Sequence, residues 1–332
     1  MKKGTRMIDI AERLNISVVT VSNALNDRGG VSPELREMIK KTADKIGYQY
    51  ENSGKNPGRT ETQNIGLLIV ECGTAEKSRL YWQISQCISS ELIKQNMFAM
   101  NETLNIEAEH EGIIPRIVSE HKISALVVLG TLSEEYTLLL RKHNIPLLFV
   151  DSSENSFGGV DSVVIDSFHG TCLITEKLIK SGHSKIGFVE DAYLPSWHDK
   201  FLGYKKALMK NNIHFCNEWR IKDRMVSEIP ALDRDNMPTA FVCENDTVAM
   251  RTIYSLRKLG INVPEEVSVV GFGNELSPDI CDPPLTTVGI NLPALAETTV
   301  SIIEKKLDNF DYSAGTRFIL GGIIERESVQ NI

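Results

Sequence analysis

The sequence predicts an α/β fold, with an N-terminal helix-turn-helix head of three helices and a core of two doubly wound parallel-sheet lobes. Residues 1–48 contain three short amphipathic stretches, residues 49–62 are polar with two glycines and a proline, and residues 63–332 alternate apolar runs with amphipathic stretches. Such alternation is typical of parallel sheets whose crossover helices cover both faces. Because the alternating region is large for one such sheet, we expect two lobes with a cleft between them.

The first 48 residues are predicted to form a compact DNA reader. Residues 7–14 have apolar side chains at helical spacing and form the first helix. Ser17 can cap a second helix by accepting a backbone N–H. Pro33 suits the first position of a third helix, which Gly47 ends. Two short helices joined tightly and backed by a third are the architecture of a helix-turn-helix unit.

The second helix carries the expected base-reading face. Its inward stripe is Val21, Ala24 and Leu25, so the residues between them turn outward. DNA contacts are expected from Ser17, Val18, Val19, Thr20, Ser22, Asn23 and Asn26. Lys55 and Arg59 in the linker are expected to add phosphate or minor-groove contacts. The alternative is an ordinary amphipathic hairpin that packs on the rest of the protein.

Charge is distributed unevenly along the chain. Residues 1–60 hold 11 Lys and Arg against 7 Asp and Glu, whereas the remaining residues hold 25 against 37. A basic head on an acidic body concentrates the attraction for phosphates at one end. This distribution favours DNA binding over the simple hairpin.

Composition predicts a soluble protein of the reducing cytoplasm. The 332 residues are 42% hydrophobic, the longest apolar runs have only the length of a strand, and the N-terminus leads directly into a helix rather than into a signal sequence. The six cysteines lie far apart without a CxxC pair, which argues against a disulfide framework or a zinc site. We expect no membrane segment, no metal and no cofactor.

The core is expected to contain eight strands and at least six helices. The strands are predicted at 65–70, 98–101, 125–129, 146–150, 163–165, 186–189, 240–243 and 267–271. The amphipathic helices are predicted near 80–95, 107–120, 133–143, 169–181, 200–212 and 246–259.

An enzyme is not expected. The segment that begins at Gly73 follows a strand, but Glu76 stands where a phosphate loop requires a glycine before its lysine. The chain contains no GxGxxG, GxSxG or HExxH pattern, and its seven histidines have no ligand spacing. We therefore predict no catalytic residues.

Several long segments resemble the lactose/galactose repressor (LacI/GalR) family in the family's own order. They include IDIAERLNISVVTVSNALN, VSPELREMIKKTADKIGY, PTAFVCENDTVAM and LGINVPEEVSVVGFGN, followed by PPLTTV and IIERES. The resemblance implies a periplasmic-binding-protein-like core of two lobes joined by three crossovers. One lobe would take residues 63–163 and 292–320, and the other 164–291 and 321–332. It also implies a homodimer on a pseudo-palindromic operator in double-stranded DNA, and a small-molecule effector bound between the lobes.

The effector site is inferred from the same resemblance, residue by residue. The positions that it implies are Tyr81, Trp82, Asp166, Lys200, Asn245, Asp246 and Asn274. Aromatic rings stack on the apolar face of a sugar, while amides and carboxylates bind its hydroxyls. The alternatives are core packing for Tyr81 and Trp82 and helix capping for Asp166 and Asp246, since each aspartate precedes a predicted helix.

Two departures from the family pattern fall in this site. Lys200 stands where many sugar-binding relatives carry an arginine, and Gly273 stands where many carry an aspartate. Lysine lacks the bidentate fork of arginine, and glycine removes a carboxylate that would bind hydroxyls. Together with Lys77 and Arg79, Lys200 could suit a phosphorylated or acidic ligand; the alternative, which the sequence favours, is that Lys77 and Arg79 are solvated surface residues.

The linker is an atypical hinge. Family members usually carry a hinge helix here, with a leucine that wedges into the minor groove, and Pro57 occupies the leucine position. Proline in a helix interior costs about 3 kcal/mol, and Gly54 and Gly58 disfavour the helix further. We predict that the wedge is absent.

These observations predict a cytoplasmic, dimeric, DNA-binding transcription regulator, most simply a repressor, whose core senses a sugar or a related metabolite. The first alternative is a small-molecule receptor whose basic head is an interaction module. The second is a regulator controlled by a protein partner, as in the catabolite control branch of the family.

Overall fold

The computed structural model comprises two units, Met1–Glu61 and Thr62–Ile332, and each is considered by itself. The described residues are 7–14, 16–25, 31–46, 63–71, 75–152, 160–190, 199–222, 236–274, 277 and 280–332. Among the helices within these ranges, none has both the length and the apolar character needed to cross a bilayer.

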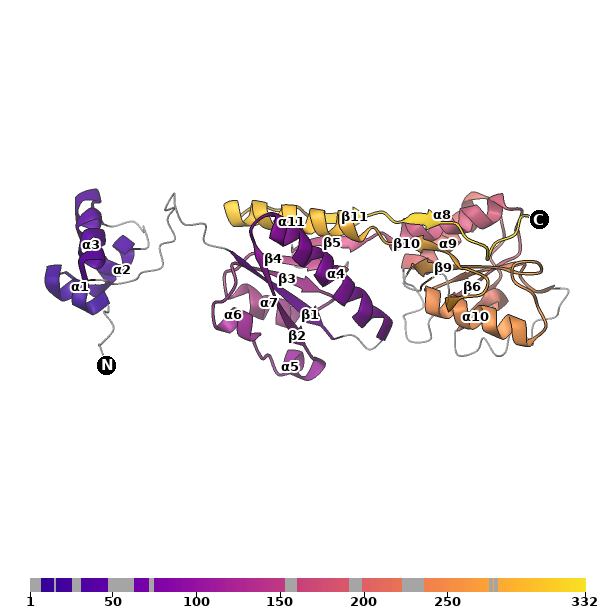
Figure 1. The fold of residues 1–332 in the computed structure, drawn as a ribbon, viewed down its shortest axis with the longest axis horizontal. Coiled ribbons are helices and arrows are strands. Elements are labelled where there is room, and N and C mark those ends of the chain that lie inside the picture. Colours follow the sequence, from indigo (N-terminus) through magenta and orange to yellow (C-terminus); the bar gives the residue numbers. More distant parts are fainter. Residues whose placement is uncertain are drawn as a thin grey trace. The chain divides into compact units, whose positions relative to one another are not determined.

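Within the described residues, the head has three helices (Figure 1), and they share one small apolar core. They are α1 (Met7–Leu14), α2 (Val18–Leu25) and α3 (Pro33–Ile46). All three contribute to the buried set of Ile10, Ala11, Val21, Ala24, Leu25, Ile39 and Ala43. Ser17 caps α2, because its Oγ accepts the Thr20 N–H at 3.0 Å. The Arg36 guanidinium donates to the Ala24 carbonyl at 3.4 Å and so ties α3 to the end of α2.

The core contains two six-stranded sheets with equivalent strand orders (Figure 1). The first sheet runs β11 (Thr316–Ile319), β5 (Asp161–Ile165), β4 (Leu147–Val150), β3 (Ala125–Leu129), β1 (Asn64–Val70) and β2 (Phe98–Leu104). The second runs β12 (Gly322–Ile324), β10 (Thr286–Gly289), β9 (Ser268–Gly273), β8 (Ala240–Cys243), β6 (Ile186–Glu190) and β7 (Arg220–Lys222). The described pairings are parallel, apart from the antiparallel pair of β10 and β12. This arrangement confirms the predicted fold class.

Helices lie on both faces of each sheet. Those that pack on the first sheet are α4 (Ala75–Lys94), α5 (Ile106–His110), α6 (Arg116–Ser119), α7 (Glu134–Arg141) and α11 (Leu292–Asp308). Those that pack on the second sheet are α8 (Ser167–Lys180), α9 (Asp199–Lys210) and α10 (Asp246–Lys258), and a short 3-10 helix, Asn217–Trp219, precedes β7.

Strand β1 shows why both faces are covered. Ile65, Leu67 and Ile69 belong to the apolar cluster that contains residues of α4 and α11. Leu68 and Val70 point the other way, into the cluster that contains residues of α6 and α7. Side chains alternate along a strand, so a strand that is apolar at every position must be buried on both faces.

The chain passes between the two sheets three times, after Ile165, after Gly289 and after Ile319. Each sheet is therefore completed by residues that lie far from the rest of it in sequence. The second lobe ends with such a segment: Ser328 donates its hydroxyl to the Val269 carbonyl at 2.6 Å, and the Ile332 N–H donates to the Ser181 carbonyl at 2.9 Å.

A buried carboxylate fixes the segment between α11 and β11. Asp161, at the start of β5, accepts the Ser313 hydroxyl at 2.8 Å and the N–H groups of Ala314 and Gly315 at 2.9 and 2.7 Å. The Lys306 ammonium lies 2.6 Å from its other oxygen. Burial alone would raise the pKa of Asp161, but these hydrogen bonds outweigh it and hold the pKa below the ordinary 3.8.

The structure differs from the predicted elements in one long helix and several short strands. The helix expected at 107–120 is two short helices, α5 and α6. Gly112 has a left-handed backbone with φ of 68°, and Pro115 stands just before α6, so the chain turns between them. Helix α11 and the strands β7, β10, β11 and β12 lie outside the predicted set.

Candidate functional site

The outward face of α2 is the candidate DNA-reading surface. Val21, Ala24 and Leu25 are buried, whereas Ser22 and Asn23, which lie between them along the helix, are half-buried. The geometry therefore places two polar side chains opposite the apolar stripe, as a major-groove reader requires.

The first turn of α2 is held in one conformation by its cap. The exposed Ser17 hydroxyl lies 2.8 Å from the Thr20 hydroxyl, in addition to accepting the Thr20 N–H. A helix N-terminus with free backbone N–H groups also favours an approaching phosphate. Of the other predicted DNA contacts, Asn26, Lys55 and Arg59 lie outside the described residues, as do the side chains of Val18 and Val19.

In the core, five of the predicted effector residues lie at the ends of strands. Asn245 and Asp246 follow β8, Asn274 follows β9, and Lys200 reaches the end of β8 from α9, all in the second lobe, whereas Asp166 follows β5 of the first sheet. The carboxyl ends of parallel strands are where α/β folds bind small molecules.

Tyr81 and Trp82 have different environments on α4. Tyr81 is buried, and its ring lies 3.1 Å from the position that a Cβ on Gly130 would occupy. Gly130, just beyond β3, has φ of 114° and leaves space for this ring. Trp82 is 48% exposed. Tyr81 thus adjoins a strand end of the first sheet, whereas Trp82 lies partly in solvent.

The two aspartates have different local roles. Asp166 caps α8: one carboxylate oxygen accepts the His169 N–H at 3.0 Å, and the other lies 2.8 Å from the His169 ring nitrogen Nδ1. Helix α10 is capped instead by Asn245, which accepts the Val248 N–H at 2.8 Å. The capping alternative for Asp246 is therefore wrong, because Asn245 occupies the cap position.

Asp246 and Asn274 are each held by a residue from the last part of the chain. Asp246 is buried and accepts the Thr287 hydroxyl at 2.5 Å. Asn274 has a left-handed backbone with φ of 55°, and its side-chain oxygen accepts from the Arg326 guanidinium at 2.7 Å. Arg326 also donates to the Leu285 carbonyl at 2.6 Å.

The Lys200 ammonium is bound within its own lobe. It donates to the Glu244 carbonyl at 2.9 Å and lies 3.3 Å from the Glu244 carboxylate. It also lies 4.4 Å above the ring of Phe272 at the end of β9. Lys200 therefore joins α9 to the ends of β8 and β9.

Glu244 and a second buried carboxylate, Glu190, are absent from the predicted site. Each follows the apolar residues of its strand, on neighbouring strands whose preceding residues, Val189 and Cys243, are in register. Glu190 accepts two hydrogen bonds from the Arg220 guanidinium at 3.0 and 2.7 Å. In the sequence, each of the two is an acidic residue directly after an apolar run. A carboxylate that is buried at such a position requires a cationic or hydrogen-bonding partner.

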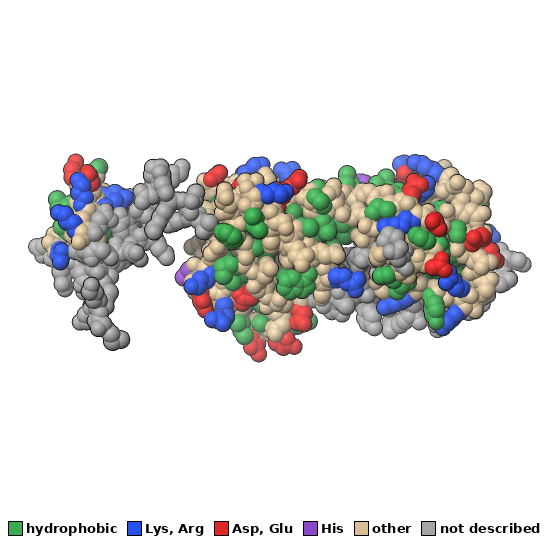
Figure 2. Space-filling view, in the orientation of Figure 1, with side chains coloured by type: hydrophobic (Ala, Val, Ile, Leu, Met, Phe, Trp, Pro, Cys, Tyr) green, Lys and Arg blue, Asp and Glu red, His purple; other side chains and the backbone are tan. Residues whose placement is uncertain are grey.

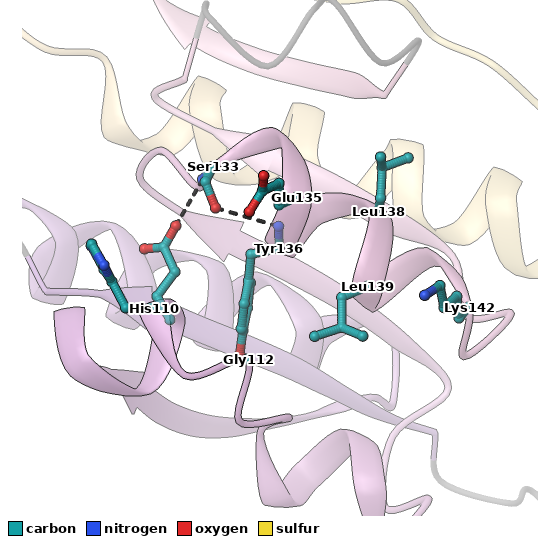
Figure 3. A pocket seen from close by; sticks show the side chains of 9 residues that line it. His110, Gly112, Ser133, Glu135, Tyr136, Leu138, Leu139 and Lys142 are labelled. Atoms are coloured by element: carbon teal, nitrogen blue, oxygen red, sulfur yellow. Dashed lines mark hydrogen bonds between the residues drawn. The ribbon is translucent and has the colours of Figure 1, made fainter.

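A separate pocket of about 550 Å³ lies between α5 and α7 on the first lobe (Figure 3). Its lining includes Glu109, His110, Ser133, Tyr136 and Lys142, and none of the predicted effector residues. Glu109 accepts the Ser133 N–H at 2.7 Å, and the Tyr136 hydroxyl donates to the Ile113 carbonyl at 2.6 Å. Burial raises the pKa of Tyr136 to about 12, with a further contribution from the nearby Glu109 and Glu102. This hydroxyl therefore stays protonated at neutral pH.

Two family models match the chain. The one for "Bacterial regulatory proteins, lacI family" matches residues 6–50, and the one for a "Periplasmic binding protein-like domain" matches residues 175–329. The first covers the described head and the second covers most of the second lobe together with α11 and β11.

Curated relatives align along nearly the whole chain. The HTH-type transcriptional repressor PurR of Vibrio vulnificus (strain CMCP6) is 24% identical over 334 residues, which is 98% of each chain. The NTD biosynthesis operon regulator NtdR of Bacillus subtilis (strain 168) is 28% identical over 306 residues, 89% of this chain and 91% of the relative.

Solved structures have the same fold. The lac repressor dimer bound to operator and the anti-inducer ONPF superposes with a TM-score of 0.66 at 20% identity, over 99% of this chain and 100% of that one. The complex of the transcriptional regulator CelR with cellobiose gives a TM-score of 0.68 at 21% identity, over 98% and 99% of the two chains.

Proposed function

We propose that this chain is a regulatory protein of the lacI family, a transcriptional repressor whose DNA binding is controlled by a small metabolite. It binds a pseudo-palindromic operator as a cytoplasmic homodimer. The metabolite, a sugar or a related compound, binds at the strand ends of the core. The protein performs no catalysis.

The recognition helix is the observation that carries this proposal. Helix α2 has a capped first turn, buries one apolar stripe, and leaves Ser22 and Asn23 on the other side. An Asn side chain can make a two-pronged contact with the edge of an adenine in the major groove. The excess of Lys and Arg in residues 1–60 supplies the attraction for phosphates.

The proposed effector site is supported by the polar strand ends of the core. Asp166, Asn245, Asp246 and Asn274 provide carboxylate and amide groups that can bind hydroxyls, and Tyr81 provides an aromatic ring on the other lobe. Solved structures of the same fold were determined with cellobiose and with ribose. A polyhydroxylated effector fits these groups.

The proposed homodimer follows from the DNA side. One helix-turn-helix reads only a few base pairs, and two heads related by a two-fold axis read two half-sites about one helical turn apart. The lac repressor structure with the same fold is a dimer bound to operator.

A DNA-binding experiment tests the proposal. The full chain should retard fragments taken from the vicinity of its own gene at nanomolar concentration, in the presence of excess unrelated DNA. Addition of one metabolite class should shift that affinity. Failure to select any fragment over unrelated DNA, with the fold intact, would favour the small-molecule receptor with an interaction head.

A further inference from the structure

The cations that border the strand ends of the second lobe are bound by acceptors of the chain itself. Within the described part of that lobe, Lys200, Arg220 and Arg326 each contact a residue at or just beyond a strand end. Whether these three cations can bind a ligand therefore depends on the contacts that they already make within the chain.

Lys200 has three partners within the lobe. Its ammonium donates to the Glu244 carbonyl at 2.9 Å, forms an ion pair with the Glu244 carboxylate at 3.3 Å, and lies 4.4 Å from the centre of the Phe272 ring. The side chain is 20% exposed and that of Glu244 only 2%, so water screens this pair weakly.

The guanidinium groups of Arg220 and Arg326 also donate hydrogen bonds to acceptors within the chain. Arg220 gives two hydrogen bonds to the buried Glu190 and lies 4.0 Å above the Phe201 ring. Arg326 donates to Leu285 and to Asn274, as described above. Lys200 and Arg220 are therefore each paired with a buried carboxylate, whereas the two acceptors of Arg326 are neutral.

The second-lobe strand ends also carry the buried carboxylates Glu190, Glu244 and Asp246, and Asp166 follows β5 of the first sheet; all four are less than a tenth exposed. A phosphate or carboxylate placed among them would meet like charges at low local dielectric, while Lys200 and Arg220 are already paired. A hydroxyl or an ammonium group would instead find acceptors.

We propose that Glu244 determines effector specificity: by holding and neutralising Lys200, it restricts the effector site to uncharged or amine-bearing polyhydroxylated compounds and rejects phosphorylated or acidic ones. The proposal rests on the effector site of the proposed function. Specificity arises here from a repulsive element that penalises the wrong ligand, as well as from contacts with the right one. The acidic ligand that Lys77, Arg79 and Lys200 suggested from sequence is accordingly disfavoured.

The test compares anion binding by the full chain and by Glu244→Gln. The probe is inorganic phosphate, titrated at constant ionic strength against sodium chloride and followed by calorimetry and by thermal unfolding. Any attraction of phosphate to the basic head is common to both proteins, so the quantity compared is the difference in phosphate affinity between wild type and the variant. In Glu244→Gln the released Lys200 should bind phosphate saturably, with affinity higher on the order of tenfold or more, as expected for one charge-assisted hydrogen bond.

Two further variants test whether Lys200 is the group that binds phosphate. The double variant with Glu244→Gln and Lys200→Met should lose the gain in phosphate affinity. Glu176→Gln is the matched control, because Glu176 pairs with Lys210 at 2.8 Å between α8 and α9, away from the strand ends, and it should behave as wild type.

Either of two results would overturn the proposal. One is saturable phosphate binding by wild type as tight as by Glu244→Gln. The other is a folded Glu244→Gln protein that gains no phosphate affinity. If Glu244→Gln does not fold, the wild-type titration with glucose 6-phosphate against glucosamine decides: tighter binding of the phosphate contradicts the proposal and tighter binding of the amine supports it. DNA retardation by wild type, measured in parallel, reports separately on the proposed function.

Discussion

Asn23 stands on α2 between the buried Val21 and Ala24, and its own side chain is half-buried. Changing Asn23 to Ala removes the group expected to contact a base and should cost about 1–3 kcal/mol of binding at one base position in each half-site. The check is a binding series on operators mutated one position at a time.

The way in which the loss of affinity varies with operator sequence distinguishes two roles for Asn23. A loss confined to one base position identifies a base contact, whereas an equal loss on every sequence would make Asn23 a backbone contact instead. Thr42→Ala provides the control. Thr42 lies on α3 and its hydroxyl donates to the Met38 carbonyl at 2.8 Å, so its removal should leave DNA affinity unchanged.

Asp161 is a buried charge of the first lobe that is paired with Lys306. Replacing it with Asn leaves the ammonium of Lys306, itself only 11% exposed, without its carboxylate. Breaking a buried pair in this way should lower the free energy of unfolding by about 3–5 kcal/mol. Urea denaturation at pH 7 measures the difference.

The same pair should make stability depend on acidity. The folded pKa of Asp161 lies below its ordinary value of 3.8, so the charged form is favoured by folding. Its contribution is complete above about pH 5 and is lost as the pH falls through the folded pKa. The difference in the free energy of unfolding between wild type and Asp161→Asn should therefore narrow in acid. A difference that stays constant down to pH 3 would contradict this prediction, because it would mean that folding does not shift the pKa of Asp161.

Among the elements, those with clear end signals could be predicted from the sequence. Helix α3 begins at Pro33, as the proline preference for a first turn predicts, and the apolar strands β1 and β3 lie within a residue of their expected bounds. The stretch 107–120 was predicted wrongly as one helix, although Gly112 and Pro115 were signals of the break that the sequence itself contains.

The short strands could not be predicted. Strands β7 and β12 have three residues each and are partly exposed, so they have neither a periodic pattern nor a continuous apolar run. They exist because an existing sheet edge offers backbone hydrogen bonds, which is a tertiary cause. Helix α11, by contrast, had a usable signal: Asn291 caps it by accepting the Ala294 N–H at 3.1 Å, ahead of a proline in the first turn.

The predicted effector residues show the same division. Asp166 and Asn245 were inferred from the family resemblance, and each is a helix cap in the structure. The buried carboxylates Glu190 and Glu244 were not predicted, because their partners Arg220 and Lys200 lie 30 and 44 residues away along the chain. Pairing at that separation depends on the strand order of the sheet, which one sequence does not display.

The head as a unit should carry all of the DNA affinity. Removing residues 1–60 should abolish DNA binding and leave effector binding intact, because the remaining residues are acidic overall. In the full chain, the logarithm of affinity should fall with the logarithm of salt concentration, with a slope of roughly −0.9 per phosphate neutralised. Retardation of DNA by the truncated core would show that the head is not the reader.

For the whole molecule on DNA, the linker sequence predicts weak bending. Residues 47–62 lie outside the described part of the structure, so the prediction rests on Pro57, Gly54 and Gly58. A wedge residue unstacks a base step, at a cost of a few kcal/mol, and thereby kinks the DNA. This linker lacks the apolar residue that would insert between the bases. Circular-permutation gel shifts should show a smaller bend than for a repressor with a hinge helix.

A second measurement separates the cause. Pro57→Leu alone should leave the bend unchanged, since both glycines still disfavour a helix. Pro57→Leu combined with Gly54→Ala and Gly58→Ala should increase it. A large bend in wild type, or an ordered helix at 52–58 in a DNA complex, would contradict the prediction.

The three passages between the sheets also govern the order in which the protein can be made. The edge strand of the first sheet, β11, and that of the second, β12, both lie within residues 316–324, and Ser328 and Ile332 close the second lobe. The head is complete once residue 46 has emerged from the ribosome, whereas neither lobe is complete until residues 316–324 have been added. A nascent chain can thus present a folded DNA reader over some 270 residues of synthesis while it still lacks a finished effector site, and the ability to respond to the metabolite is acquired only after β11 and β12 have emerged.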